Sequence, residues 1–494
     1  MLGILAVRER GMLKTSARIL ILLAFSIFAV QAQQTSTLSP VTKNFVSVDS
    51  PLVALEHVRV IDGTGAAAAP DQTILIEGGK IREIGKSGAV SVPAGAFRMD
   101  LTGRTVIPGL VGMHDHLFYP SASGQGNPAG APRLYGEMGF SFPRLYLAGG
   151  VTSLRTTGSL EPYADLALKK LIDTGQIPGP KMHITGPYLE GVGSFAPQLH
   201  ELSGPDDAVR LVNYWLDEGV TSFKAYMHIT RAELGAAIKA AHARGAKLTG
   251  HLCSVGFSEA ADLGIDDLEH GLVVDTEFNP AKQPDACPSG PNSVIEKLDL
   301  KSEPVQAMIR KLVQHHVAIT STIVIFETFA PDRPPLQDRV LKALSLPSRT
   351  DYLEARAKVA ERGGSGAELL KKEMQFELEF VKAGGLLLSG EDPTGYGGVL
   401  AGFGDQRQVE LLVEAGFSPL EAIHIATQNG AEFLGEAERI GTLKPGKQAD
   451  LVVIQGDPSQ KIADIENVEI VFKDGVGFDS RKLIDSVQGA VGLR

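Results

Sequence analysis

The sequence predicts an α/β protein in which a (β/α)8 barrel is flanked at both ends by β-rich segments. The chain has 494 residues, which exceeds a single barrel of roughly 250 residues and leaves room for a companion domain. Between residues 107 and 437, apolar runs of strand length alternate with helical stretches, as in a parallel sheet. Short alternating strands separated by Gly and Pro turns occupy 51–106 and recur in 438–494.

The first 32 residues have the composition of a secretory signal. Small residues follow an apolar run over 19–30, and we expect cleavage after Ala32 and export to the periplasm or the exterior. An uncleaved anchor is the alternative, although the run is shorter than the roughly 20 apolar residues that a membrane span needs. Met12 is an alternative start, and 33–50 are expected to form a polar linker. Four basic residues precede the apolar run: Arg8, Arg10, Lys14 and Arg18.

The composition is that of a globular protein with a substantial core, because 43% of the residues are hydrophobic and 21% are charged. A net charge of -11 argues against a surface for nucleic acids, which requires clustered Lys and Arg. We therefore expect the partner to be a small molecule and not a nucleic acid, and we expect no membrane contact after signal cleavage. Whether the protein forms a homo-oligomer is left open by the sequence. Only Cys253 and Cys287 are present, and the sequence leaves their pairing open.

The region predicted as a barrel supplies the required number of strands. An Ala-rich stretch at 231–245 ends in Gly and predicts a helix between the fourth and fifth strands, and a second helix is expected over 419–434. The eight expected strands lie within 106–117, 150–158, 181–189, 219–227, 246–253, 266–273, 317–326 and 384–393.

Two histidines stand two residues apart at the end of the first expected strand. Alternate side chains of a strand share one face, so His114 and His116 can converge on one metal ion while Asp115 points away. On its own this spacing is equally met by packing or solvent-exposed histidines. Lys224 lies within the fourth expected strand, where a buried cation needs a partner. A salt bridge is the simpler explanation, and a carbamate formed with carbon dioxide, which could bridge two ions, is the other.

Three further metal-ligand types fall at the ends of other expected strands. His251 and His270 end the fifth and sixth, and Asp392 ends the eighth. Active sites of such barrels gather at the carboxyl ends of the strands, so these side chains should meet His114 and His116. Together they predict a metal centre.

The motifs resemble those of the amidohydrolase superfamily over nearly all of the chain after the signal. The resembling stretches are PGLVGMHDHL, FKAYM, GH, EHG and GEDP at the site, and VRVIDGTG, GGKIREIG and GTLKPGKQADLVVI at the two ends. The resemblance implies that 51–106 and 438–494 form one small β-sandwich beside a metal-dependent hydrolase barrel at 107–437. Weaker features are similar to Xaa-Pro dipeptidase-like and imidazolonepropionase-like members, and Lys224 favours the branch with two metal ions.

In that family the site residues would have defined roles. His114, His116 and Asp392 would hold one divalent ion, His251 and His270 the other, and carboxylated Lys224 would bridge them. Zinc suits this ligand mixture, and manganese, iron and cobalt are the alternatives. A hydroxide between the ions would attack the carbonyl, and Asp392 would transfer the proton to the leaving nitrogen.

The expected reaction is hydrolysis of an amide or peptide-like C–N bond in a dipeptide or an N-acyl amino acid. Ester, lactone or phosphotriester hydrolysis on the same centre is one alternative, and a non-catalytic binding protein on a degenerate barrel is another. Loops after the strands should contact the substrate. Their candidate residues are Arg155, Tyr188, Glu190, Tyr226 and His228, although Arg155 is equally suited to a structural ion pair and Tyr226 and His228 to packing.

Overall fold

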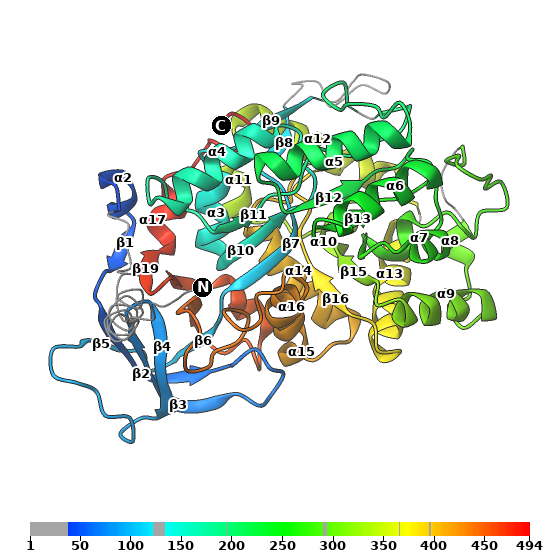
Figure 1. Cartoon of the computed structure of the whole chain (residues 1–494). Coiled ribbons are helices and arrows are strands. Elements are labelled where there is room, and N and C mark those ends of the chain that lie inside the picture. Colours follow the sequence, from blue (N-terminus) through cyan, green and yellow to red (C-terminus); the bar gives the residue numbers. More distant parts are fainter. Residues whose placement is uncertain (1–37, 122–133, 195, 290–293, 365, 395–396) are drawn as a thin grey trace, which may run out of the picture.

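The structure is a computed structural model that describes residues 38–121, 134–194, 196–289, 294–364, 366–394 and 397–494 (Figure 1). The predicted signal sequence lies outside these ranges, so it stays a prediction. Part of the segment predicted as a linker is structured, because it contains helix α2 (Pro40–Lys43) and strand β1 (Val46–Val48). Among the described residues, none of the helices combines the length and apolar character that crossing a bilayer requires.

Eight strands form two parallel sheets, and each lies within one of the eight segments predicted from the sequence. The first sheet has the order β11-β10-β7, and the second has the order β12-β13-β14-β15-β16. Every neighbouring pair runs parallel. The strands are β7 (Leu110–Asp115), β10 (Val151–Thr156), β11 (Lys181–His183), β12 (Ser222–Ala225), β13 (Lys247–Gly250), β14 (Asp267–Glu269), β15 (Ala318–Ser321) and β16 (Leu387–Ser389).

Backbone contacts link the two parallel sheets at both of their edges. Beyond β11, Thr185 forms a parallel bridge with Ser222. Beyond β16, the amide of Asp392 donates a hydrogen bond to the carbonyl of His114 at 2.9 Å. The two sheets therefore present the carboxyl ends of their strands to a common region of an α/β fold.

Helices occupy most of the connections between these strands. Helix α6 (Arg231–His242) matches the predicted helix and begins with a capping box between Thr230 and Glu233, which satisfies the first backbone amides. The predicted helix at 419–434 is continuous but contains a π-helical turn. The other helices are α3 (Phe142–Gly149), α4 (Pro162–Asp173), α5 (Pro205–Glu218), α7 (Phe257–Leu263), α8 (Val294–Lys297), α9 (Glu303–Gln314), α10 (Ile323–Glu327), α11 (Asp338–Ala343), α12 (Leu346–Arg362), α13 (Gly366–Lys382), α14 (Phe403–Ala415), α15 (Pro419–His424), α16 (Gly430–Phe433) and α17 (Ser480–Asp485).

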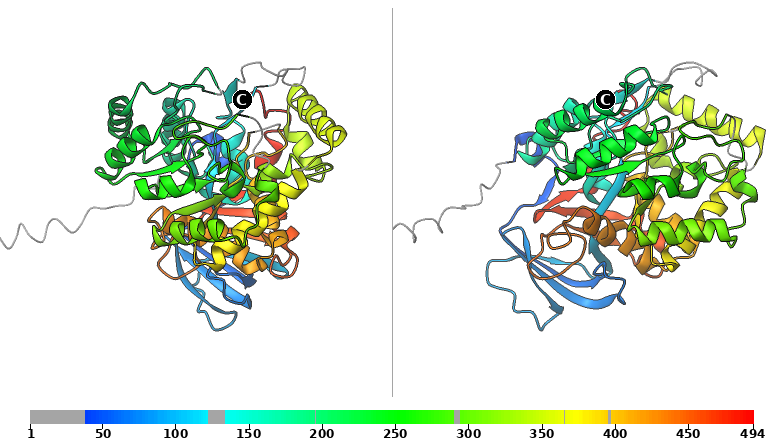
Figure 2. Two further views of the ribbon diagram at one scale, coloured as in Figure 1. Left: turned by 90° about the vertical axis from the view of Figure 1, so that its right-hand side faces the viewer. Right: turned by 45° about the vertical axis from the view of Figure 1, so that its right-hand side comes forward.

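The two ends of the chain meet in one nine-stranded sheet. Its order is β1-β19-β18-β17-β6-β2-β3-β4, with β5 paired to β2. Strand β17 pairs antiparallel with β6 and so joins the C-terminal strands to the N-terminal ones, of which β2, β3 and β4 form the lower end of both views in Figure 2. Its members are β2 (Leu52–Val60), β3 (Ala69–Glu77), β4 (Lys80–Lys86), β5 (Phe97–Asp100), β6 (Arg104–Pro108), β17 (Leu451–Gln455), β18 (Val468–Lys473) and β19 (Val476–Asp479).

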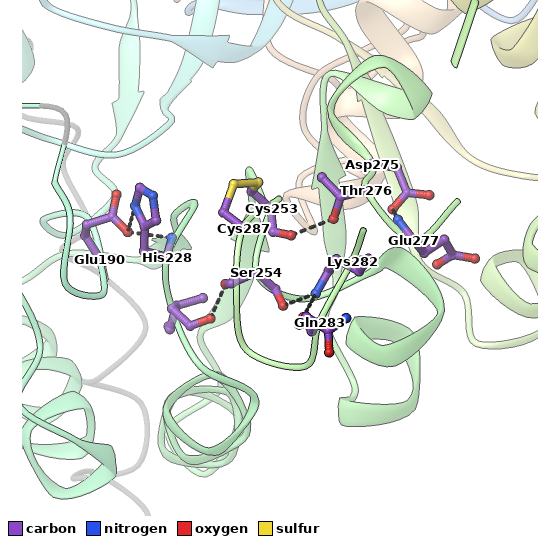
Figure 3. Close-up of a disulfide and its surroundings, with 11 residues drawn as sticks. Glu190, His228, Cys253, Ser254, Asp275, Thr276, Glu277, Lys282, Gln283 and Cys287 are labelled. Carbon is purple, nitrogen blue, oxygen red and sulfur yellow. Dashed lines mark hydrogen bonds and ion pairs between the residues drawn. A yellow bond between two sulfur atoms is a disulfide. The ribbon is translucent and has the colours of Figure 1, made fainter. Parts of the chain in front are cut away.

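Cys253 and Cys287 form a disulfide, which settles the pairing that the sequence left open (Figure 3). The bond ties the segment after β13 to a loop that lies 34 residues further along the chain. Hydrogen bonds reinforce this contact. The Thr276 hydroxyl donates to the Cys253 carbonyl, and the Lys282 ammonium donates to the Ser254 carbonyl, both at 2.6 Å.

Replacing both cysteines by serine should lower the free energy of unfolding by about 4 kcal/mol, because the cross-link restricts a loop of this length in the unfolded chain. Guanidinium unfolding with and without dithiothreitol measures the effect. The reductant should weaken the natural protein and leave the Cys253→Ser/Cys287→Ser variant unchanged. Equal stability of the two proteins under oxidising conditions would contradict the prediction.

Candidate metal centre

The six predicted metal-ligand residues lie at the carboxyl ends of the parallel strands. His114 belongs to β7 and Lys224 to β12, and the other four follow directly or closely after a strand. Five of the six are buried and His251 is partly buried. We call this set the candidate metal centre: His114, His116, Lys224, His251, His270 and Asp392.

The side chains of this set converge. Ligand atoms of His114, His116 and Asp392 all lie within 4.8 Å of one another. The Nε2 atoms of His116, His114 and His270 are 3.5, 3.7 and 3.9 Å from the Asp392 carboxylate. The Lys224 Nζ atom is 3.1 Å from His114 Nε2, and the ring centroids of His251 and His270 are 4.5 Å apart.

Fixed groups orient three of the imidazoles through their Nδ1 atoms, which directs each Nε2 toward the common centre. These contacts are His114 to the Glu269 carboxylate (2.6 Å), His116 to the Gly158 carbonyl (3.2 Å) and His270 to the Thr322 hydroxyl (2.7 Å). Sequence reasoning assigned no role to these three partners. Glu269 could have been predicted from the sequence, since it directly precedes His270. The Gly158 carbonyl and Thr322 could not, because neither is marked by a sequence motif.

Burial sets the protonation of the centre. It lowers the pKa of each of the four histidines, to about 3 for His251, so their neutral, metal-binding forms predominate at neutral pH. Burial alone would raise the pKa of Asp392, but His114 and the hydrogen bond from His116 hold it well below its usual range. Burial also lowers the pKa of Lys224 to about 8.

Two members of the centre have strained backbones. His270 and Asp392 have φ angles of 70° and 51°, a left-handed region that costs non-glycine residues about 1–3 kcal/mol. Gly390 allows the Asp392 segment to approach β7, because a Cβ atom there would lie 2.3 Å from the His114 amide nitrogen. The surrounding fold therefore holds these two ligands in place.

Arg155, which the sequence suggested as a substrate contact, is instead part of a buried ion cluster. Its side chain is 2% exposed, and its Nη2 atom lies 2.8 Å from Asp267 and 2.9 Å from Glu269. Its Nε atom also donates to the Met113 carbonyl. The structural ion pair considered as the alternative is therefore the correct interpretation, and Arg155 supports Glu269, which in turn orients His114.

A pocket opens onto the centre. Of the other four suggested substrate contacts, two line this pocket and two do not. Tyr188 and Tyr226 line the pocket, and their contact with substrate stays a prediction. Glu190 is outside its lining and fully buried, where it accepts the backbone amides of Gly191 and His228 at 2.9 and 2.8 Å. Its carboxylate and the His228 ring face each other at 3.5 Å (Figure 3). The lining residues are His116, Phe118, Tyr135, Tyr188, Lys224, Tyr226, His251, His270, Asp392 and Thr394.

Comparisons with known proteins match a short stretch by sequence and most of the chain by structure. The model of the amidohydrolase family matches residues 397–477. The dihydroorotase of Pelobacter propionicus is 32% identical over 111 residues, which are 22% of this chain and 23% of that protein. Adenine deaminase 4 of Rhizobium meliloti is 33% identical over 70 residues, 14% of this chain and 12% of that one. The chain thus spans less than a quarter of the length of these curated relatives.

Solved structures resemble nearly the whole described fold. A Xaa-Pro dipeptidase with methionine bound in its active site has a TM-score of 0.65 at 20% identity, covering 87% of this chain and all of that one. A putative prolidase from Bifidobacterium longum has a TM-score of 0.62 at 24% identity, covering 88% and 98%. Bottromycin amidohydrolase has a TM-score of 0.65 at 20% identity, covering 90% and 91%. The family match confirms the predicted resemblance to the amidohydrolase superfamily over 397–477, and the solved structures show that the fold is shared over most of the chain.

Proposed function

We propose that the protein is a metal-dependent hydrolase that cleaves an amide or peptide-like C–N bond of a small molecule, such as a dipeptide or an N-acyl amino acid. The observation that carries the proposal is the convergence of His114, His116 and His270 on the Asp392 carboxylate, with each imidazole held through Nδ1. The names of the similar structures, which include a Xaa-Pro dipeptidase and a prolidase, support this class of bond.

The proposal includes a closed (β/α)8 barrel at 107–437 and a β-sandwich built from 51–106 and 438–494. The order of the eight parallel strands and the links at both sheet edges support the barrel. Pairing of β17 with β6 supports a terminal domain made from both ends of the chain. The disulfide supports export, because such bonds persist in oxidising compartments.

The donor set fits two divalent metal ions, for which zinc is the natural candidate. His270 Nε2 is buried and has no hydrogen-bond partner among the described residues, as expected of a ligand atom awaiting an ion. His114, His116 and Asp392 would hold one ion, and His251 and His270 the second. Bound ions would supply Lewis acidity toward the scissile carbonyl and lower the pKa of a water molecule.

Lys224 is suited to the bridging carbamate. Within the described ranges it forms no ion pair with a carboxylate, so the salt bridge considered from the sequence is absent there. With a pKa of about 8, a fraction of its amine is neutral near physiological pH and can react with carbon dioxide. Asp392, held as a carboxylate, would accept a proton from the attacking water and deliver it to the leaving nitrogen.

Metal content and substrate class test this proposal together. After reconstitution with zinc and bicarbonate, elemental analysis should find about two equivalents per chain. A substrate screen should then show hydrolysis of Xaa-Pro or N-acyl dipeptides above that of lactones, hydantoins and phosphotriesters.

Fewer than one metal equivalent would overturn the two-ion centre. Preferred cleavage of lactones or phosphotriesters would show that the protein catalyses one of the alternative reactions and not hydrolysis of a C–N bond. Binding of these compounds without turnover, in protein that carries both ions, would indicate a non-catalytic protein. Lys224→Met is the matched variant, because it removes the amine that would form the bridging carbamate. It should bind less metal than the natural protein and keep the disulfide-linked fold.

A further inference from the structure

The turn that carries His270 starts with two successive residues in the left-handed conformation. His270 and Gly271 have φ angles of 70° and 75°, and a single helical turn follows at Gly271–Val274. His270 stands at the cap position of this turn, yet its side chain accepts no hydrogen bond from it. The imidazole is instead directed into the candidate metal centre, with Nδ1 2.7 Å from the Thr322 hydroxyl. The first amides of the turn therefore need an acceptor from elsewhere in the chain.

Glu373 supplies this acceptor from helix α13, where its side chain is fully buried. The amide of Leu272 donates to one carboxylate oxygen at 3.2 Å, and the amide of Val273 donates to the other at 2.8 Å. The carboxylate also packs so closely on Gly271 that a Cβ atom there would lie 1.9 Å from it. Glu373 thus does for this turn what a Ser or Asp side chain at the cap position usually does.

The burial of Glu373 needs an explanation, because moving a carboxyl group out of water is unfavourable unless it is compensated. Within the described ranges, the two amides are its hydrogen-bond donors, and no cationic side chain pairs with it. Glu377, one turn further along α13, is a second buried carboxyl group and makes the position less favourable still. The two hydrogen bonds to the turn are therefore the compensation that the structure provides.

We propose that Glu373 is a positioning residue of the candidate metal centre, which holds the turn at 270–273 and so keeps His270 Nε2 directed into that centre. The inference rests on the proposed function, because it concerns a ligand of the same centre. The two bonded amides lie only two and three residues beyond His270. Without the carboxylate, these amides would need other acceptors, and His270 would relax from its strained backbone conformation.

Zinc titration in bicarbonate buffer tests the inference, with Glu373→Met as the variant. Methionine keeps the length and the burial of the side chain but accepts neither amide. The ion assigned to His114, His116 and Asp392 should bind as in the natural protein. The second ion should bind about 10- to 100-fold more weakly, which is the usual effect of losing a residue that orients a ligand. Glu373→Gln keeps one acceptor and should weaken the second ion less.

Glu201→Met is the matched control. The Glu201 carboxylate also accepts two consecutive backbone amides, those of Gly193 and Ser194, each at 2.9 Å. The turn that it holds carries no member of the candidate metal centre, so both ions should bind this variant with natural affinity.

Two results of the titration would overturn the positioning role. Equal weakening of both ions in Glu373→Met would indicate a general loss of structure. Natural affinity for both ions in Glu373→Met would show that the turn does not depend on the carboxylate. If the methionine variant does not fold, Glu373→Gln supplies the test, and natural affinity for the second ion in that variant has the same meaning.

Nitrogen-15 spectra of the histidine rings in metal-free protein separate this inference from the proposed function. In the natural protein, the contact with Thr322 should keep the His270 ring in one tautomer, and Glu373→Met should give a mixture. Such a mixture, with less than one metal equivalent bound by the natural protein, would support the positioning role and overturn the metal-dependent function. An unchanged ring in Glu373→Met would overturn the positioning role, and the function would stand if the natural protein binds two ions.

Discussion

Replacing Asp392 by asparagine should reduce kcat by about 10³-fold or more while the protein remains folded. The carboxylate lies 3.5 Å from His116 Nε2 and 3.7 Å from His114 Nε2, and its pKa is held well below the usual range. Asparagine keeps the shape but can neither accept nor return a proton. General acid–base groups typically contribute 10²- to 10⁴-fold, and loss of a metal-binding charge adds to this.

Steady-state kinetics and elemental analysis of the same preparation check this expectation. At least one metal equivalent should remain, because the four histidines are intact. Asp217→Asn, a change in an exposed ion pair with Arg244, serves as the control and should keep full activity. Turnover of Asp392→Asn within tenfold of the natural protein would remove Asp392 from the proposed proton transfer.

Replacing Arg155 by methionine should lower the free energy of unfolding by about 4 kcal/mol. The guanidinium is the buried partner of both Asp267 and Glu269, and its loss leaves two carboxylates together without a cation. Burial and the nearby Glu269 already raise the pKa of Asp267 to about 6. Because Glu269 also orients His114, the variant should lose catalytic activity as well as stability.

Guanidinium denaturation of the metal-free protein isolates the effect on folding from any effect on metal binding. Arg244→Met provides the comparison, since its pair with Asp217 is exposed and should contribute less than about 1 kcal/mol. A loss below 1 kcal/mol for Arg155→Met would show that the buried cluster is not a major source of stability. Activity is then measured without denaturant, at a temperature at which both variants are folded.

The strand pattern could be predicted because parallel strands buried on both faces consist of short apolar runs. Strands β7, β10 and β16 are buried throughout, and each lies inside its predicted segment. The number of strands in the nine-stranded sheet was harder to predict from the sequence. β1 lies in a stretch that reads as polar linker, and it is structured because it pairs with β19, more than 400 residues away.

The six members of the candidate metal centre could be predicted from a single geometric rule. Side chains that follow different parallel strands meet at the carboxyl end of the fold, so His114, His251 and Asp392 can be grouped without knowing any distance. The rule does not say which neighbouring side chain reaches the pocket. It grouped Arg155 with the substrate contacts and passed over Phe118 and Tyr135, although Phe118 lies only two residues beyond His116.

The sequence by itself determined the α/β class, the positions of the eight parallel strands and the identity of the six converging residues. These features depend on local hydrophobic patterns and on residue types at strand ends. Only the tertiary structure decided the Cys253–Cys287 disulfide, the support of His114 by Glu269 and the burial of Arg155. The contacts of Glu269 with His114 and with Arg155 join side chains more than 100 residues apart in the sequence. The disulfide joins cysteines that are 34 residues apart. Their strength comes from shared burial and mutual orientation, which exist only once the chain has folded.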